Sequence, residues 1–335
     1  MYNSRIKGLG RYVPEKVVTN DDLAKIIDTS DAWIQERTGI KERRYVADEF
    51  ETTTSMGVKA AQIAIERSGI AKEEIDFIIF ATLSPDYYFP GSGVLLQREL
   101  GLNTIGALDI RNQCSGFIYA LSIADQFIKT GMYKNILIVG SEVHSRGLDF
   151  TTRGRAVTVI FGDGAGAAVI SREENPNKGI LSTHLHSEGQ HAEELALIAP
   201  GMGRRWVTDI IKDNNPEDES YLPYMNGQFV FKNAVTRMME VVEEGLSHNQ
   251  LTSKDIDMFI AHQANLRISQ YIQQKLELPD SKTFNNIQKY GNTTAASIPI
   301  ALTEAWEQGK IKEYDLVVLA AFGSGFTWGS AIIRW

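Results

Sequence analysis

The sequence contains a single cysteine, so no disulfide can form within the chain and we expect a reducing, cytoplasmic setting. No apolar run approaches the roughly 18–20 residues of a membrane-spanning helix, and one of the longest covers only residues 316–322. The net charge is −8, which argues against a nucleic-acid-binding protein. The first residues also lack the charged-then-apolar layout of a signal peptide. We therefore expect a globular protein with an ample core.

The lone cysteine, Cys114, lies between an apolar, strand-like segment at 105–110, expected to be buried, and a segment of helical periodicity at 117–127. Unpaired backbone N–H groups at a helix N-terminus favour a thiolate and would lower the thiol pKa from about 8.5. The alternative is an inert buried cysteine, the commoner fate of a lone thiol. His262 and Asn292 also follow apolar runs, so the three side chains could converge at one end of a sheet.

The chain repeats itself at an offset near 180 residues. Residues 74–79 (EIDFII) recur as residues 255–260 (DIDMFI), and residues 112–114 correspond to residues 292–294. Each copy ends in a glycine-rich turn followed by a β-like run. This order predicts two similar α/β halves, 1–171 and 179–335, joined by a charged, proline-containing linker.

Strands alternate with helical patterns in each half, which favours mostly parallel sheets covered by helices. Full burial explains why residues 136–139 are continuously apolar. A pseudo-twofold axis between the halves would bring Cys114 and Asn292 face to face. Residues 189–225 break the pattern, and such a long polar connection is either a functional lid or a disordered insert.

Cysteine, histidine and asparagine together serve two reactions. In papain-like proteases the histidine is the base for the cysteine and the asparagine orients the histidine. In a decarboxylating Claisen condensation, Cys114 would hold an acyl group as a thioester, and neutral His262 and Asn292 would donate hydrogen bonds to an enolate. The backbone N–H groups of Cys114 and of the turn containing Ser324 could stabilise the oxyanion on the cysteine side.

The motifs resemble those of 3-oxoacyl-[acyl-carrier-protein] synthase III, within the thiolase-fold superfamily, over residues 6–335. The motifs that carry the resemblance occur in the family's order: DAWI at 31–34 with RTGI at 37–40, CSGF at 114–117, FGDGAG at 161–166, HQANLRI at 262–268, GNTT at 291–294 and FTWGS at 326–330.

This resemblance implies a five-layered αβαβα, thiolase-like α/β fold, assembled as a homodimer. It implies catalysis by Cys114, His262 and Asn292, with backbone N–H groups of Cys114 and Ser324 forming the oxyanion hole. It further implies three groups of contact residues: Trp33, Arg37, Arg155 and Gln228 for coenzyme A; Lys232, Gln263, Asn265, Arg267 and Lys275 for acyl carrier protein; and Phe89 for the acyl pocket. No cofactor and no metal are implied, coenzyme A thioester being a substrate.

The implied reaction is the condensation of an acyl-CoA starter with malonyl-acyl carrier protein, which initiates type II fatty acid biosynthesis. The open alternatives are a type III polyketide-synthase-like enzyme and a specialised long-chain acyl condensing enzyme. A thiolase would need a second cysteine, and an elongating synthase a second histidine in place of Asn292. A cysteine hydrolase lacks support from the duplicated pattern, and a non-catalytic chain-binding subunit would require an inert Cys114.

The sequence departs from the family pattern in three ways. Ser324 replaces the middle glycine of a turn, Gln228 replaces a usual asparagine, and Gln274 stands where a lysine is common. The 189–225 stretch is also longer than usual, which leaves the acyl-chain preference open. His184, His186 and His191 are close in sequence, but no well-placed carboxylate or cysteine completes a metal site.

Overall fold

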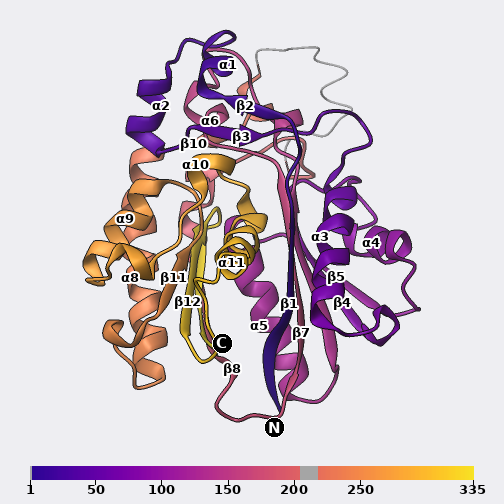
Figure 1. The fold of residues 1–335 in the computed structure, drawn as a ribbon. Coiled ribbons are helices and arrows are strands. Elements are labelled where there is room, and N and C mark those ends of the chain that lie inside the picture. The colour runs from indigo at the N-terminus through magenta and orange to yellow at the C-terminus, as the bar shows by residue number, and fades with distance from the viewer. Residues whose placement is uncertain (1, 204–217) are drawn as a thin grey trace.

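The computed structural model describes residues 2–203 and 218–335, and two mixed β-sheets dominate it (Figure 1). The first sheet has the strand order β1-β7-β6-β4-β5 and the second the order β11-β12-β13-β8. The strands of the first sheet are β1 (Asn3–Tyr12), β4 (Phe77–Ala81), β5 (Gly106–Ile110), β6 (Asn135–Glu142) and β7 (Gly164–Glu173). Those of the second sheet are β8 (Gly179–Ser187), β11 (Met258–Ala261), β12 (Leu316–Gly323) and β13 (Thr327–Arg334). The chain thus leaves one sheet for the other between Glu173 and Gly179.

Helices form the three remaining layers. Two central helices, α5 (Gly116–Lys129) and α11 (Ser297–Glu307), contact both sheets. The outer helices α3 (Thr53–Ser68) and α4 (Ser92–Leu100) cover the first sheet, and α8 (Gly227–His248) covers the second with α9 (Leu266–Lys275) packed beside it. This αβαβα order is the predicted thiolase-like architecture. No helix in the described ranges is long and apolar enough to cross a membrane.

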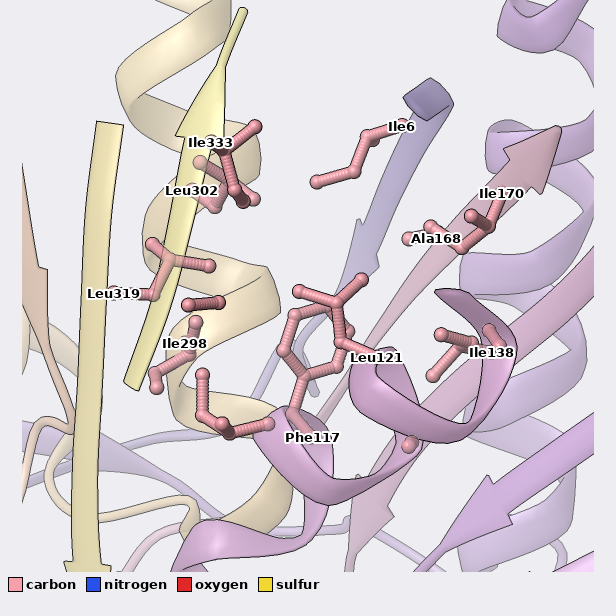
Figure 2. Packing of buried hydrophobic residues seen from close by; sticks show 14 of the residues in the cluster. Ile6, Phe117, Leu121, Ile138, Ala168, Ile170, Ile298, Leu302, Leu319 and Ile333 are labelled. Carbon is pink, nitrogen blue, oxygen red and sulfur yellow. The ribbon is translucent and has the colours of Figure 1, made fainter. Parts of the chain in front are cut away.

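The central layer carries the main core. Phe117 and Leu121 of α5 point toward Ile298 and Leu302 of α11, and isoleucines of both sheets close around them (Figure 2). The side chains of Phe117 and Leu121 are fully buried. Burying a side chain of this size contributes about 1.5–3 kcal/mol. The core therefore spans both halves, and it fixes the N-termini of α5 and α11 relative to one another.

The expectation of mostly parallel sheets was wrong. Among the described strands, β4 runs parallel to β5 and β6, and β11 runs parallel to β12, whereas the remaining pairs of the two large sheets are antiparallel. Strand β13 follows β12 after a short turn, and such a connection leaves no room for the crossover that a parallel pair needs. Strand β5 was expected to be buried, but it forms the edge of its sheet and only Ile110 is buried.

The duplication is visible in the order of the helices and strands. At the turns before the two central helices, the offset between the two copies is one residue longer than expected. A 3₁₀ turn at Gln113–Ser115 leads into α5, and its counterpart at Thr294–Ala296 leads into α11. The offset is 181 residues there, so Ala295 rather than Thr294 is the structural counterpart of Cys114. The loops of Cys114 and Asn292 are nevertheless equivalent, as the sequence repeat predicted.

Short elements form a cap over one end of the sheets (Figure 1). They are β2 (Val17–Thr19), α1 (Asn20–Ala24), α2 (Asp31–Thr38), β3 (Glu42–Arg44), α6 (Arg155–Thr158) and α10 (Ile287–Tyr290). Part of the 189–225 insert is ordered as β9 (Leu195–Ala196), which pairs with β10 (Tyr224–Met225). Residues 204–217 of the insert lie outside the described residues.

Candidate active site

Cys114 lies in the 3₁₀ turn before α5 and is 8% exposed. The end of β12 passes directly over it. A Cβ atom at Gly323 would lie only 2.6 Å from the Cβ of Cys114 and 3.1 Å from its Sγ. Only glycine permits so close an approach, which places the turn after β12 against the thiol.

The expected low thiol pKa is wrong for this structure. Burial, and next the negative charge of Glu142, raise the pKa of Cys114 to about 12. The backbone N–H groups of Cys114 and Ser324 hydrogen-bond the thiol and lower its pKa, but by less than burial raises it. Desolvation raises the thiol pKa by more than the helix N-terminus lowers it, because Cys114 lies in the packed interface between the two halves, just before α5.

Glu142, at the end of β6, is a fully buried carboxyl that the sequence did not single out. It accepts hydrogen bonds from the hydroxyls of Thr82 (3.0 Å) and Ser84 (2.6 Å) and from the backbone N–H of Leu83 (3.1 Å). Burial raises its pKa to about 7. The hydrogen bonds favour the carboxylate but do not offset burial, so the carboxyl beside the cysteine is only partly ionised at neutral pH.

His262 follows β11 and is 3% exposed. Its Nδ1 lies 2.6 Å from the hydroxyl of Ser297, the first residue of α11. The backbone N–H of Gln263 donates to the same hydroxyl at 3.4 Å. When the Ser297 hydroxyl donates its proton to Nδ1, the imidazole proton lies on Nε2.

The Nε2 atom of His262 is buried, and none of the described residues hydrogen-bonds it. Burial also lowers the pKa of His262 to about 3, so the ring is neutral at physiological pH. A neutral ring with a free Nε2–H is a hydrogen-bond donor aimed at whatever occupies the adjoining cavity. Such a donor costs stability while it is unpaired, which is typical of a group kept ready for a ligand.

Asn292 is held by both halves of the molecule. Its backbone N–H donates to the carbonyl of Ile160 (2.9 Å), and its own carbonyl accepts from Gly162 (3.0 Å). Its side-chain Oδ1 accepts the backbone N–H of Thr294 at 2.8 Å. This bond occupies the amide oxygen and leaves the Nδ2 hydrogens as the donors available to the cavity.

A single cavity of about 620 Å³ brings the three predicted residues together. Cys114, His262 and Asn292 all line it. Its other lining residues are mostly apolar, and they include Phe161, Leu195, Met225, Val230, Met238, Ile268 and Phe322. Strand β9 and its partner β10 therefore contribute to the wall, so the ordered part of the insert covers the site.

The residues expected to contact coenzyme A gather at this cavity. Trp33, Arg37 and Gln228 line it, and Arg155 adjoins it. The guanidinium carbons of Arg37 and Arg155 lie 4.4 and 4.8 Å from the centre of the Trp33 ring. Arg155 also donates to the backbone carbonyl of Asp28 at 2.8 Å. An aromatic ring flanked by two cations is suited to a nucleotide with phosphate groups.

The expected carrier-protein residues divide into two groups. Lys232, Arg267 and Lys275 are exposed, and Arg267 also lines the cavity. Gln263 is a correction, because it is 3% exposed and both ends of its side-chain amide bond backbone groups. Asn265 is half-buried, and it caps α9 while its Nδ2 donates to the carbonyl of Arg37.

Ser324 and Phe89 occupy different surroundings. The N–H of Ser324 faces the Cys114 thiol, as the oxyanion-hole prediction requires, and its hydroxyl bonds the carbonyl of Leu195 in β9. The extra hydroxyl thus ties the turn to the insert. Phe89 is 80% exposed and lies outside the cavity of its own chain.

Three supporting residues escaped the sequence reasoning: Ser297, Glu142 and His144. His144 is buried, and its Nε2 lies 2.6 Å from the hydroxyl of Thr294. None of the three belongs to a recognisable motif of its own. Only their positions in the sequence could have indicated them, because each lies within a few residues of the end of a strand or of the GNTT motif. Within the described residues, no group of three or more His, Cys, Asp or Glu side chains is arranged to hold a metal ion.

Comparison with known proteins identifies the family. Residues 108–189 match the model of 3-oxoacyl-[acyl-carrier-protein] synthase III, and residues 246–335 match the model of its C-terminal part. The β-ketoacyl-[acyl-carrier-protein] synthases III of Sulfurimonas denitrificans and Ehrlichia canis are each 44% identical to this chain. The match to the Sulfurimonas denitrificans protein covers 99% of this chain and 98% of that protein. The match to the Ehrlichia canis protein covers the whole of both chains. The crystal structure of the Aquifex aeolicus synthase III is 44% identical and has a TM-score of 0.90, covering 99% of this chain and 100% of its own. Because the fold, the motifs and full-length relatives agree, this chain belongs to the 3-oxoacyl-[acyl-carrier-protein] synthase III family.

Proposed function

We propose that this enzyme condenses an acyl-CoA starter with malonyl-acyl carrier protein to give 3-oxoacyl-acyl carrier protein, CO2 and coenzyme A. This is the initiating condensation of type II fatty acid biosynthesis. The observation that carries the proposal is one cavity lined by Cys114, by the neutral donors His262 and Asn292, and by Trp33 and Arg37. These residues provide a nucleophile, two hydrogen-bond donors for the enolate and a binding site for coenzyme A, which are the groups that the reaction needs.

In the first half-reaction the Cys114 sulfur attacks the carbonyl carbon of the acyl-CoA. The thiol is protonated in the free enzyme because burial raises its pKa to about 12. Its proton therefore leaves during the attack and passes to the departing coenzyme A sulfur. The oxyanion forms beside the N–H groups of Cys114 and Ser324, which already hydrogen-bond the sulfur.

In the second half-reaction the malonyl thioester loses CO2 and leaves an enolate. The thioester oxygen of that enolate accepts hydrogen bonds from His262 Nε2–H and Asn292 Nδ2–H. Both groups are neutral donors, so neither attracts the malonyl carboxylate into a stable salt bridge that would oppose its departure. The enolate carbon then attacks the acyl-Cys114 carbonyl, and the cysteine sulfur leaves and regains a proton.

The mouth of the cavity suits the two carriers. Trp33 with Arg37 and Arg155 supports binding of the coenzyme A nucleotide, and Gln228 lies along the same channel. Lys232, Arg267 and Lys275 form an exposed basic group, which we call the basic rim, on α8 and α9. A local positive rim on a chain of net charge −8 supports docking of an acidic carrier protein.

A homodimer completes the proposal. Tyr87, Tyr88 and Phe89 form an exposed aromatic group, with exposed fractions of 51%, 54% and 80%. The edge strand β5 has no further strand beside it in the described chain. A second copy could pair at this edge and place Phe89 in the acyl pocket of its neighbour, which would shield both exposed features.

The test is acyl transfer to the single cysteine. Intact mass spectrometry after exposure to a panel of acyl-CoAs should show one acyl adduct, and its mass identifies the starter. Cys114→Ser should show no adduct while its circular dichroism and melting temperature stay unchanged, because a serine hydroxyl is a far weaker nucleophile. Full loading of the variant would place the nucleophile elsewhere. Condensation with malonyl-CoA as well as with malonyl-acyl carrier protein would favour the polyketide-synthase alternative.

A further inference from the structure

We propose that His144 is a positioning residue for Asn292, holding Thr294 in the backbone conformation that turns the Asn292 amide toward the enolate. The inference rests on the proposed function, since it assigns a task within the decarboxylation step. His144 belongs to the N-terminal half and Thr294 to the C-terminal half, so the contact joins the two halves beside the cavity.

The His144 ring is held rigidly. It is 8% exposed, and it lies just after β6. Its backbone N–H donates to Asp163 Oδ1 at 2.7 Å, and the hydroxyl of Ser145 donates to the other oxygen of that carboxylate at 2.6 Å. A ring on a backbone anchored in this way can impose a position on its partner.

Thr294, which is hydrogen-bonded to the His144 ring, needs contacts that hold its backbone in place. Thr294 has a φ of +50°, in the left-handed region that β-branched residues rarely adopt. This backbone conformation is strained for a threonine, so surrounding contacts must maintain it. It also points the Thr294 N–H at Asn292 Oδ1, at 2.8 Å. The hydrogen bond between the Thr294 hydroxyl and His144 Nε2, at 2.6 Å, is one such contact.

A second contact acts on the backbone of Asn292. The His144 ring lies against the Phe161 ring, with 4.7 Å between the centroids. Phe161 forms a β-bridge with Asn292, between the two hydrogen bonds that Ile160 and Gly162 make to the Asn292 backbone. His144 thus braces both the side-chain amide and the main chain of Asn292.

The ring acts as a neutral hydrogen-bonding group. Burial lowers the pKa of His144 to about 3, so the ring carries no charge at neutral pH. A neutral Nε2 pairs with the Thr294 hydroxyl either as acceptor or as donor, according to the tautomer. The contact at position 144 therefore requires a hydrogen-bonding side chain of this shape and does not require a charge.

The experiment separates the two half-reactions in purified enzyme. His144→Leu removes the hydrogen bond and keeps most of the volume, and His144→Gln replaces Nε2 by an amide at a similar reach. We expect the Leu variant to decarboxylate malonyl-acyl carrier protein about 10-fold to 100-fold more slowly, because small misplacements of a catalytic group have effects of this size. Acyl loading of Cys114 should stay near the wild-type rate, and the Gln variant should recover part of the lost decarboxylation.

Further variants distinguish positioning from general destabilisation. Thr294→Val should reproduce the defect, and the double variant with His144→Leu should be no slower than either single one, because the two side chains act as one unit. His184→Leu is the matched control, since His184 hydrogen-bonds Glu244 on the outer side of the second sheet. It should change neither half-reaction.

Three outcomes decide the matter. Wild-type decarboxylation in His144→Leu would overturn the proposal, and so would an equal loss of loading and decarboxylation. Asn292→Ala tests the proposed function separately: if it decarboxylates normally, Asn292 has no role in that step and the proposed mechanism fails first.

Discussion

At the residue scale, the site depends on groups kept in uncommon protonation or bonding states. Cys114 stays a thiol at neutral pH, His262 stays neutral, and the Nε2 atom of His262 lacks a partner among the described residues. Glu142 adds a buried negative charge that opposes ionisation of the thiol. These states all follow from burial at the junction of the two halves.

The reactivity of Cys114 should follow its raised pKa. Alkylation by iodoacetamide should accelerate steadily from pH 7 to pH 10 without a plateau, because the thiolate fraction keeps rising toward a pKa of about 12. Glu142→Gln should lower the thiol pKa and speed alkylation at pH 8, since it removes a negative charge. Glu244→Gln is the control and should not change the rate. A plateau below pH 9 in the wild type would contradict the assignment.

His262→Ala and Asn292→Ala should separate the half-reactions. Each variant should lose about 10²–10³-fold in malonyl decarboxylation, because each removes one donor to the enolate oxygen. Acyl loading of Cys114 should suffer much less in both, as measured by the rate of adduct formation. A His262→Ala enzyme that decarboxylates normally but cannot load would instead assign His262 as the base for Cys114.

At the element scale, the two backbone N–H groups that face the thiol come from opposite halves, one from Cys114 itself and one from Ser324. The 3₁₀ turn before α5 provides Cys114, the last residue of β12 is Gly323, and the turn that follows provides Ser324. The hydroxyls of Ser115 and Thr327 join these turns at 2.7 Å. The close approach of β12 to the cysteine therefore brings the Ser324 N–H against the thiol, as the proposed oxyanion hole requires.

Gly323→Ala tests this approach. A methyl group there would lie 2.6 Å from the Cβ of Cys114 and must displace it. Overpacking of this kind costs about 1–3 kcal/mol, so we expect a lower free energy of unfolding and loss of acyl loading. Gly147→Ala is the matched control, because nothing lies within 4 Å of the added atom. Unchanged loading in Gly323→Ala would mean that β12 can retreat without disturbing the thiol.

At the scale of the whole molecule, the distribution of charge is uneven. The chain is acidic overall, whereas the three exposed residues of the basic rim lie on α8 and α9. Electrostatic steering by such a rim accelerates encounter with an acidic protein and weakens as salt rises. Arg267 belongs to the rim and lines the cavity, so its two roles must be distinguished.

Arg267→Glu should raise the KM for malonyl-acyl carrier protein several-fold, with a smaller difference from wild type at high salt. The KM for acyl-CoA should barely move, because that substrate would enter past Trp33 and Arg37. Lys254→Glu makes the same charge change on an exposed residue away from the cavity and should leave both values unchanged. An equal loss for both substrates would show that Arg267 shapes the shared channel.

The amino-acid sequence alone determined the family, the two-part α/β architecture and the three residues that meet in the cavity. These follow from local patterns: motif spacing, the repeat near 180 residues, and the periodicities that predict strands and helices. The same patterns predicted that the turn containing Ser324 lies near Cys114, and the structure sets the Ser324 N–H against the thiol.

Only the tertiary structure decided the rest. The pKa of Cys114 depends on Glu142 and on packing from residues far along the chain, so a helix-terminus argument predicted the wrong direction. Gln263 lies within a motif, yet burial commits its amide to backbone groups. The strand directions, the contact between His262 and Ser297 and the contact between His144 and Thr294 likewise arise from pairings between distant segments. Burial and hydrogen bonding across the halves are non-local, and a sequence pattern does not report them.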